Sequence, residues 1–218
     1  MSMNKTYAVF GLGRYGRAVA KELSASGVDV LAVDIDEEAV NAVAQDLPFC
    51  KCADVTDAEV LKQLDIANID VVVVAMANSL EASVLTTMLC KEAGVSRVVV
   101  KCAEEMQGKI LSRVGADKVV FPENESGIRL AKNLLSSGFS DLIELSQEVS
   151  MVETNMKKEW VGKTLSQLNF RKKYSANVVA IRLADRVQVN VDPEQPLKEE
   201  MKLIMIAETQ KLKKLRGK

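Results

Sequence analysis

The sequence predicts an α/β protein: a doubly wound parallel sheet followed by a small α+β lobe. Short apolar runs alternate with amphipathic helical stretches from residue 6 to about residue 136. A glycine-rich turn follows the first apolar run, and the alternation stops after Ser136-Ser-Gly-Phe139. Short strands that are apolar throughout, separated by helices, are typical of a parallel sheet covered by helices on both faces.

The expected strands and helices of the first part follow one another along the chain in regular pairs. Strands are expected at Thr6–Phe10, Val30–Val33, Phe49–Cys52, Val71–Ala75, Val98–Val100 and Val119–Phe121. Helices are expected at Arg17–Ser26, Glu37–Asp46, Ala58–Leu64, Leu80–Ala93, Glu105–Val114 and Ser126–Ser136. These strand–helix pairs complete a Rossmann-like sheet by about residue 121.

The turn Gly11-Leu-Gly-Arg-Tyr-Gly16 joins the first strand to the first helix. In such a strand–turn–helix, Gly11 allows a tight turn, Gly13 lets a diphosphate approach the backbone, and Gly16 lets the helix pack closely on the sheet. Asp34 closes the second strand, where an acidic side chain accepts a hydrogen bond from a ribose hydroxyl. The pattern therefore predicts a nucleotide site.

The rhythm of the second part predicts a separate α+β lobe. Short strands are expected at Val149–Thr154, Val178–Arg182, Val187–Val191 and Leu203–Ala207, with one short helix near Leu165–Leu168. We therefore place a nucleotide-binding domain at residues 1–138 and a smaller domain at residues 139–218. A sheet this small gains stability when it pairs with a second copy.

Charge and hydropathy argue against several classes of protein. The formal net charge of −1 argues against a nucleic-acid groove as the main binding surface. The residues before the first strand show no signal peptide. The longest apolar runs, such as Val71–Ala77, are far shorter than the ~20 residues that span a bilayer. We therefore expect a cytosolic protein.

The cysteines are expected to be reduced and mostly buried. Cys50 and Cys52 form a C-x-C pair, but the sequence contains no histidine and no second pair at zinc-site spacing. Core thiols are therefore expected at Cys50, Cys52, Cys90 and Cys102.

Hydride transfer is the activity that such a sheet suggests, by analogy of fold alone. Histidine, the commonest catalytic acid or base, is absent. None of Tyr7, Tyr15 and Tyr174 is followed four residues later by a lysine, as the short-chain dehydrogenases require. Hydride transfer is therefore not expected, and an NAD-dependent oxidoreductase is kept as the competing class. Turnover of a hydroxy acid or aldehyde with NAD would support that class.

Arg14 lies inside the glycine turn, where a guanidinium can bind phosphate oxygens in a bidentate manner. Backbone N–H groups already bind the diphosphate of a dinucleotide, so an additional cation favours the terminal phosphate of ADP or ATP. Asp34 and Asp36 repel a 2′-phosphate, which disfavours NADP. The alternative is that Arg14 faces solvent on the loop.

Four segments together give the chain a resemblance to a known family: Gly11–Gly16, Asp34–Asp36, Ala53-Asp-Val-Thr-Asp57 and Phe121-Pro-Glu123. Over nearly its whole length, the chain resembles the Ktr/Trk-type regulators of bacterial potassium uptake, the RCK (regulator of K⁺ conductance) proteins. They combine a TrkA-N and a TrkA-C domain, and the similarity is greatest to KtrA-like members.

The resemblance implies a cytoplasmic gating subunit rather than an enzyme. Such a subunit would lie at the inner face of the membrane, attached through a separate potassium channel or transporter of Ktr or Trk type, and would control K⁺ flux through it. Dimers would assemble into a ring, typically an octamer. A nucleotide-sensing regulator without a transporter partner is the alternative, which copurification with a channel subunit would separate from the first.

The resemblance also implies the ligand, which is ATP or ADP and, in Trk relatives, also NAD⁺ or NADH. The glycines and Arg14 would hold the phosphates, and Asp34 the ribose. The residues assigned to the nucleotide are Gly11, Leu12, Gly13, Arg14, Tyr15, Gly16, Asp34, Ile35, Asp36, Asp54, Val55, Ala75, Met76, Ala77, Asn78, Lys101 and Glu123.

Glu123 matches an acidic residue of the family that lies near the phosphates at a dimer interface and helps to hold Mg²⁺ or Ca²⁺. A carboxylate beside a triphosphate is repelled unless a hard cation bridges the two. The alternative is that Glu123 stabilises the N-terminus of the following helix. Glu125 is a further acid in the same stretch.

The second lobe of KtrA-like members binds cyclic di-AMP between two copies, and Phe170–Val179 matches that region. Ser175 stands where glycine is common in the family. The alternative is a dimerisation module with these polar residues at its surface. The residues assigned to cyclic di-AMP are Arg171, Asn177, Val178 and Pro193.

Overall fold

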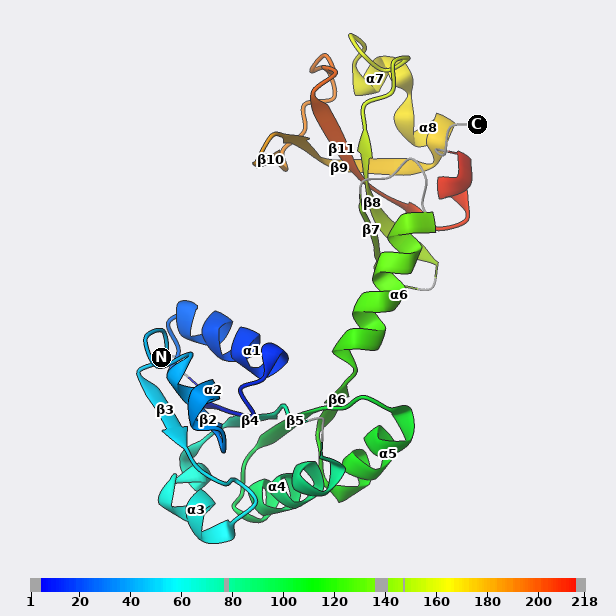
Figure 1. Cartoon of the computed structure of the whole chain (residues 1–218). Coiled ribbons are helices and arrows are strands. Elements are labelled where there is room, and N and C mark those ends of the chain that lie inside the picture. The colour runs from blue at the N-terminus through cyan, green and yellow to red at the C-terminus, as the bar shows by residue number, and fades with distance from the viewer. Residues whose placement is uncertain (1–4, 77–78, 136–140, 147, 215–218) are drawn as a thin grey trace. The chain divides into compact units, whose positions relative to one another are not determined.

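Two sheets organise the chain, one in each of two units, Met1–Asn124 and Glu125–Lys218 (Figure 1). The computed structural model describes residues 5–76, 79–135, 141–146 and 148–214. The first sheet is parallel and the second is antiparallel, which confirms the predicted fold class.

The first sheet has the strand order β3-β2-β1-β4-β5-β6, that of a Rossmann-like sheet. Since β1 lies between β2 and β4, the order reverses there, and ligands of such sheets bind beside the carboxyl ends of the strands at that point. The strands are β1 (Tyr7–Phe10), β2 (Val30–Asp34), β3 (Phe49–Cys52), β4 (Val71–Val74), β5 (Arg97–Lys101) and β6 (Lys118–Val120).

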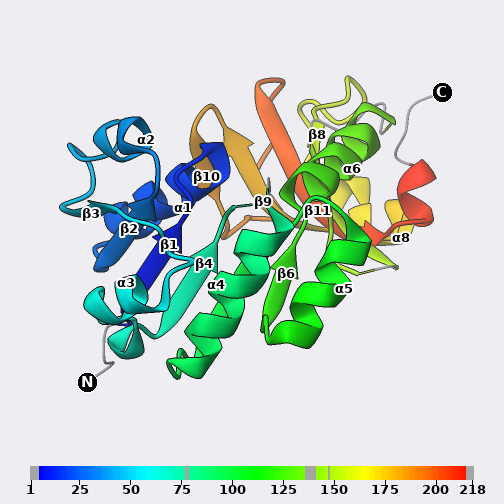
Figure 2. The same ribbon diagram turned by 60° about the horizontal axis from the view of Figure 1, so that its bottom comes forward.

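Helices cover both faces of this sheet because alternate side chains of each strand point to opposite sides. Phe10 packs in one core, and Val9 packs in the core on the opposite face. Figure 2 shows α4 and α5 lying together over the Phe10 face. The helices of this unit are α1 (Arg14–Ala25), α2 (Glu37–Asn41), α3 (Ala58–Gln63), η1 (Ile66–Asn68), α4 (Leu80–Glu92) and α5 (Glu105–Val114).

Three helix boundaries differ from the sequence prediction by more than one residue. Helix α1 begins at Arg14 rather than Arg17, directly after the extended residue Gly13. Helix α2 ends at Asn41 and continues as turns up to Asp46. Helix α6 (Pro122–Leu135) begins four residues earlier than predicted, with proline at its first position, where the missing N–H costs no hydrogen bond.

The second unit holds an antiparallel sheet in the order β10-β9-β11-β8-β7. The sequence prediction did not assign β7 or α8, and it placed β10 at Val187–Val191. The elements are β7 (Asp141–Glu144), β8 (Val149–Asn155), α7 (Leu165–Leu168), α8 (Phe170–Tyr174), β9 (Ala176–Leu183), β10 (Arg186–Gln188), β11 (Met201–Glu208) and η2 (Lys211–Lys214).

Trp160 lies at the centre of the second core and is fully buried. Its ring centroid lies 5.1 Å from that of Phe170 and 5.6 Å from that of Tyr174, both in edge-to-face geometry. The indole Nε1–H donates to the Tyr174 hydroxyl over 3.1 Å, and that hydroxyl donates to Glu159. These contacts hold α8 in the second core although the helix has only five residues.

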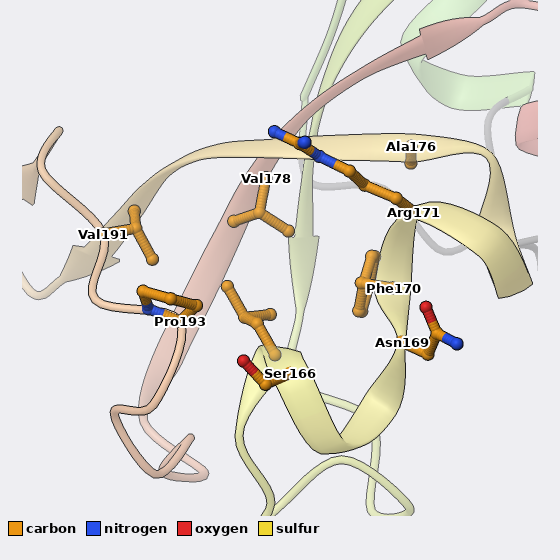
Figure 3. A pocket seen from close by; sticks show the side chains of 9 residues that line it. Ser166, Asn169, Phe170, Arg171, Ala176, Val178, Val191 and Pro193 are labelled. Carbon is orange, nitrogen blue, oxygen red and sulfur yellow. The ribbon is translucent and has the colours of Figure 1, made fainter.

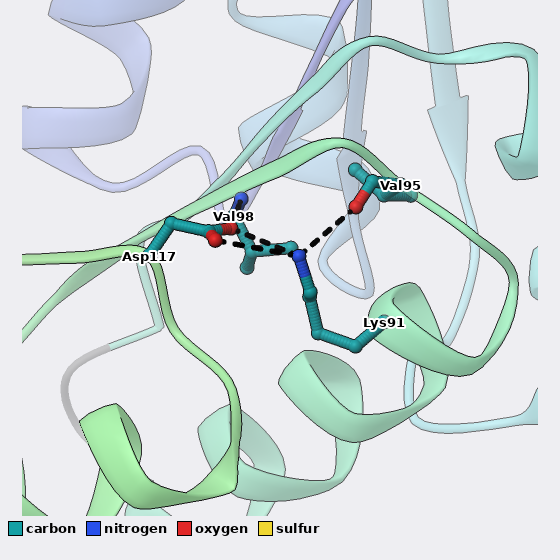
Figure 4. Close-up of polar contacts among 4 residues, drawn as sticks. All are labelled: Lys91, Val95, Val98 and Asp117. Atoms are coloured by element: carbon teal, nitrogen blue, oxygen red, sulfur yellow. Dashed lines mark hydrogen bonds and ion pairs between the residues drawn. The ribbon is translucent and has the colours of Figure 1, made fainter.

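Lys91 and Asp117 join the amino ends of β5 and β6, at the end of the sheet opposite the carboxyl ends of the strands (Figure 4). The Asp117 carboxylate accepts the Val98 N–H over 2.7 Å, and the Lys91 ammonium, 3.1 Å from that carboxylate, also donates to the Val95 carbonyl. Burial alone would raise the pKa of Asp117, but these hydrogen bonds and the Lys91 charge lower it. The pair therefore has a structural role, since it ties the end of α4 to the starts of β5 and β6.

The cysteines are free, but two of the four predicted core thiols are not buried: Cys50 is half-buried and Cys52 is exposed. Cys90 and Cys102 are buried, and burial raises the pKa of Cys90 to about 12. Cys52 is exposed because β3 is an edge strand, and its thiol lies 3.4 Å from the Ile35 carbonyl. Within the described ranges, no three Cys, Asp or Glu side chains are grouped as a metal site would require.

None of the described helices combines the length and the apolar character needed to cross a bilayer.

Candidate functional site

A cavity of about 800 Å³ lies at the carboxyl ends of the first sheet, where the strand order reverses. Its volume is within the ~300–1,000 Å³ that small-molecule sites usually occupy. The structure brings together here most of the residues that the sequence assigns to a nucleotide. Those that line the cavity are Gly11, Gly13, Arg14, Tyr15, Asp34, Ile35, Asp54, Val55, Ala75, Met76, Lys101 and Glu123.

Three assigned residues do not line the cavity. Leu12 is fully buried, Gly16 lies within α1, and the Asp36 side chain caps α2 by accepting the Glu38 N–H. Ala77 and Asn78 lie outside the described residues.

Five further residues line the cavity without having been assigned from the sequence. Ala53 and Thr56 belong to the Ala53–Asp57 segment that carries the family resemblance, so this segment was the available signal. Ser79 is the N-cap of α4, and its hydroxyl accepts the Ala82 N–H. Its place directly before that helix was the available signal for this capping role. The five residues are Val33, Ala53, Thr56, Ser79 and Ala82.

The three glycines of the turn are needed for different structural reasons. Gly11 has φ +90°, and a Cβ there would lie 2.9 Å from Met76 Cγ and 3.0 Å from the Ala75 carbonyl carbon. A Cβ on Gly16 would collide with the Gly11 carbonyl oxygen. A Cβ on Gly13 would meet nothing within 4 Å. Gly11 and Gly16 are thus required by the packing, whereas Gly13 keeps open a space in the cavity.

The N-terminus of α1 lies at this open space. Gly13 is the N-cap residue and makes no side-chain cap, and the first turn contains no acidic residue. The free N–H groups and the dipole of this helix favour an anion in front of it. The glycine cradle therefore fits the phosphate groups of a nucleotide.

Arg14 and Arg17 differ in their partners. The Arg17 Nε–H donates to the Leu12 carbonyl over 3.3 Å, so this guanidinium braces the turn. Arg14 is exposed and lines the cavity. Among the described residues, its guanidinium has no ion pair, which leaves it available to a phosphate.

Asp34 connects the glycine turn to β2. One carboxylate oxygen accepts the Leu12 N–H over 2.5 Å, and the other accepts the Asp36 N–H over 2.9 Å. Since each carboxylate oxygen has a second lone pair, Asp34 can still accept a ribose hydroxyl. Its structural role and the ligand role assigned from the sequence are therefore compatible.

Asp54 is held by its own turn. Its carboxylate accepts the Thr56 hydroxyl over 2.6 Å and the Thr56 N–H over 2.9 Å. These hydrogen bonds lower the pKa of Asp54, so its carboxylate is ionised at neutral pH.

Lys101 and Glu123 form an ion pair at the end of the cavity bounded by β5 and α6. Lys101 Nζ lies 2.6 Å from Glu123 Oε1 and 5.7 Å from the centroid of the Tyr15 ring. The Lys101 side chain is 15% exposed and that of Glu123 is 70% exposed. The hydrogen bond from Lys101 lowers the pKa of Glu123, which therefore presents a carboxylate to the cavity.

A second cavity of about 430 Å³ lies in the second unit (Figure 3). Arg171, Val178 and Pro193 line it, as the resemblance implies, and Asn169 was not assigned from the sequence. Asn177 does not line it because successive side chains of β9 alternate between faces. The other lining residues are Leu165, Ser166, Phe170, Ala176 and Val191.

Two residues beside this second cavity adopt left-handed backbone conformations. Asn169 has φ 45° and Ser175 has φ 53°. Asparagine tolerates this region well and serine less well, so the glycine common at position 175 in the family has a conformational reason.

Residues 7–122 match the TrkA-N domain, and residues 149–218 match the TrkA-C domain. The chain is 41% identical over 204 residues to Ktr system potassium uptake protein C of Bacillus subtilis (strain 168), covering 94% of this chain and 92% of that protein. It is 35% identical over 211 residues to Ktr system potassium uptake protein A of the same organism, with 97% and 95% covered.

A similar fold occurs in the GsuK channel bound to NAD, with a TM-score of 0.65 and 16% sequence identity. The match covers 100% of this chain but 40% of that channel, and at this identity it shows the fold alone.

The two curated relatives are potassium uptake proteins rather than enzymes, which confirms the expectation that the chain is not an enzyme. With a TrkA-N domain followed by a TrkA-C domain, the chain belongs to the Ktr family of potassium uptake proteins.

Proposed function

We propose that the chain is the regulatory subunit of a Ktr-type potassium uptake system and binds ATP or ADP to control K⁺ flux. The observation that carries the proposal is the cavity in which Gly13 leaves open space before the N-terminus of α1 and Arg14 has no ion pair among the described residues. The Ktr relatives support a separate membrane subunit as partner. The chain would then lie in the cytoplasm, at the inner face of the membrane.

Control of ion flux requires that the nucleotide bind one conformation more tightly than another, since equal affinity shifts no equilibrium. A difference of about 1–3 kcal/mol per site is ordinary for such coupling. Glu123 lies in the first turn of α6, the helix that leads from the first unit into the second. Along the chain, the cavity is thus one helix away from the TrkA-C domain.

Calorimetric titration of the full chain with ATP, ADP, NADH and AMP in the presence of Mg²⁺ tests this function. We expect ATP and ADP to bind, and failure of both would contradict the proposal. NADH is included because the GsuK channel, which shares the fold, is described bound to NAD. Binding of NADH in preference to both would indicate a regulator of the Trk type. Copurification with a membrane channel subunit tests the proposal that the chain has a separate membrane partner.

Replacing Arg14 by Ala is expected to weaken ATP about tenfold and AMP less than twofold, because only ATP loses a charge-assisted contact at its terminal phosphate. Arg14→Lys, which keeps the charge without the bidentate geometry, should give an intermediate loss. Calorimetry in Mg²⁺ measures these ratios. Equal losses for ATP and AMP would make Arg14 a solvent-facing residue.

Glu123 is proposed to help hold Mg²⁺ or Ca²⁺ together with the nucleotide phosphates. One protein carboxylate is too few ligands for such a cation, so phosphate oxygens and water would complete the shell. The exposure of Glu123 at the cavity supports this role.

The second cavity is proposed as one half of a cyclic di-AMP site that a second copy completes. Its cationic residue is Arg171, whose side chain Figure 3 shows reaching from α8 toward Val178. Apolar Val178 and Pro193 supply surfaces for the bases.

Helix α6 supports assembly of copies into dimers and, by the family resemblance, into an octameric ring. None of its residues is buried, and four of its large apolar side chains are exposed. Exposed apolar side chains gathered on one helix are typical of a surface that another protein covers. The exposed side chains are Ile128 at 48%, Leu130 at 59%, Leu134 at 76% and Leu135 at 77%.

The double substitution Leu134→Glu/Leu135→Glu is expected to lower the molar mass measured by light scattering after gel filtration. Charged side chains oppose burial at an interface and cost nothing at an exposed position. Val189→Glu, at a residue that is 70% exposed, is the matched control and should leave the mass unchanged. An unchanged mass for the double variant would argue against α6 as the interface.

A further inference from the structure

The pairing of Lys101 with Glu123 carries an inference that rests on the proposed nucleotide site. We propose that Lys101 is an internal counter-ion. Its ammonium group pairs with Glu123 while the site is empty, and it pairs with the phosphates instead when a nucleotide and a divalent cation bind. The two partners come from different elements, since Lys101 ends β5 and Glu123 lies in the first turn of α6. Their atoms lie 2.6 Å apart.

The burial of the two side chains is unequal, and this decides which one depends on the other. Glu123 is 70% exposed and can be hydrated, whereas Lys101 is only 15% exposed. A largely buried ammonium group needs an anion beside it. Water can therefore replace Lys101 at Glu123, but Lys101 releases Glu123 only when another anion takes its place.

The other anionic groups of the cavity are already engaged. Asp34 accepts two backbone N–H groups, and Asp54 accepts the hydroxyl and the N–H of Thr56. A phosphate in front of α1 would be the incoming anion for Lys101. The centroid of the Tyr15 ring lies 5.7 Å from the Lys101 ammonium, and Tyr15 lines the same cavity. The attraction between the ring and the ammonium favours a position of Lys101 Nζ beside the cavity.

This arrangement couples the phosphate and the cation. Without a divalent cation, phosphates compete with Glu123 for Lys101 and are repelled by the carboxylate. With the cation, Glu123 has a new partner and the competition ends. Because such coupling is reciprocal, the phosphates also increase the affinity for the cation.

Calorimetric titration of the full chain with ATP, in EDTA and in MgCl₂, tests the inference. Glu123→Gln is expected to tighten ATP binding about tenfold in EDTA, because Lys101 is no longer held by a carboxylate, and to gain little from Mg²⁺. Glu125→Gln removes the same charge two residues further along α6 and should behave like the unmodified chain.

Lys101→Met is the second variant, and it keeps the apolar stem in its buried place. It is expected to weaken ATP at least tenfold in MgCl₂ and AMP less than threefold, because only the outer phosphates lose the ammonium. Lys118→Gln, at an exposed lysine of β6, is the matched control. Since hydrated Glu123 tolerates the loss of its partner, we expect the melting temperature of Lys101→Met to stay near that of the unmodified chain.

Each arm has an outcome that overturns the inference. Unchanged or weaker ATP binding by Glu123→Gln in EDTA would show that the carboxylate does not hold Lys101 back. Unchanged ATP binding by Lys101→Met in MgCl₂ would show that the ammonium never reaches the phosphates. Either result leaves the proposed function standing, whereas failure of the unmodified chain to bind ATP and ADP overturns that function itself.

Discussion

Gly16→Ala is expected to destabilise the first unit by about 3 kcal/mol and to abolish nucleotide binding, because overpacking against backbone cannot be relieved by moving a side chain. The added Cβ would collide with the Gly11 carbonyl oxygen and lie 3.1 Å from Ala75 Cβ. To make room, α1 must move away from the sheet, and the turn with its N–H groups must move with it. Thermal denaturation and calorimetric titration measure the two effects.

Gly13→Ala is the matched control for this prediction. Gly13 has φ −62° and ψ −175°, which alanine adopts without strain, and its added Cβ meets nothing within 4 Å. Loss of the glycine N-cap should cost no more than about 1 kcal/mol. The methyl group would nevertheless occupy the space before α1, so we expect a stable protein whose ATP affinity falls at least tenfold. Equal melting temperatures of the two variants would contradict this account.

Asp34→Ala is expected to destabilise the first unit by about 2–3 kcal/mol, since hydrogen bonds to charged groups contribute more than neutral ones. The variant loses the acceptors of the Leu12 and Asp36 N–H groups, which tie the glycine turn to β2. It should also bind nucleotides at least tenfold more weakly, because it loses the proposed ribose acceptor. Denaturant unfolding and calorimetry check the two effects separately.

Asp36→Ala is the neighbouring control. Its carboxylate caps α2 through the Glu38 N–H and does not line the cavity. We expect a loss of about 1 kcal/mol, as for an N-cap, with nucleotide affinity little changed. Asp34→Asn should resemble Asp34→Ala, since an amide has one acceptor oxygen and cannot accept both N–H groups. If Asp36→Ala weakened nucleotides as much as Asp34→Ala, the ribose role of Asp34 would lose its support.

The first unit could be predicted because its signals are local. Most strands are short apolar runs, α1 and α5 have an amphipathic period, and the glycine turn stands where the chain must bend between β1 and α1. The short elements α8 and β7 carry too few residues to show a period, and tertiary packing determines them. Trp160, ten residues before Phe170, provides much of that packing in α8.

The site shows the same division. The sequence identified Lys101 and Glu123 separately, but their ion pair depends on β5 and β6 lying side by side. It also grouped Asn177 with Val178, although neighbours along a strand point to opposite faces. The exposure of Cys52 follows from the edge position of β3, which only the strand order reveals.

The order of elements, the glycine turn and the family to which the chain belongs can be read from the sequence, because they depend on the residue types and spacing of contiguous segments. Which charges meet and which groups stay available follows from the tertiary structure. Arg14 has no ion pair among the described residues, Arg17 braces the turn, and Glu123 is held by Lys101. Such pairings join residues from separate elements, and their strength depends on burial that no single segment specifies.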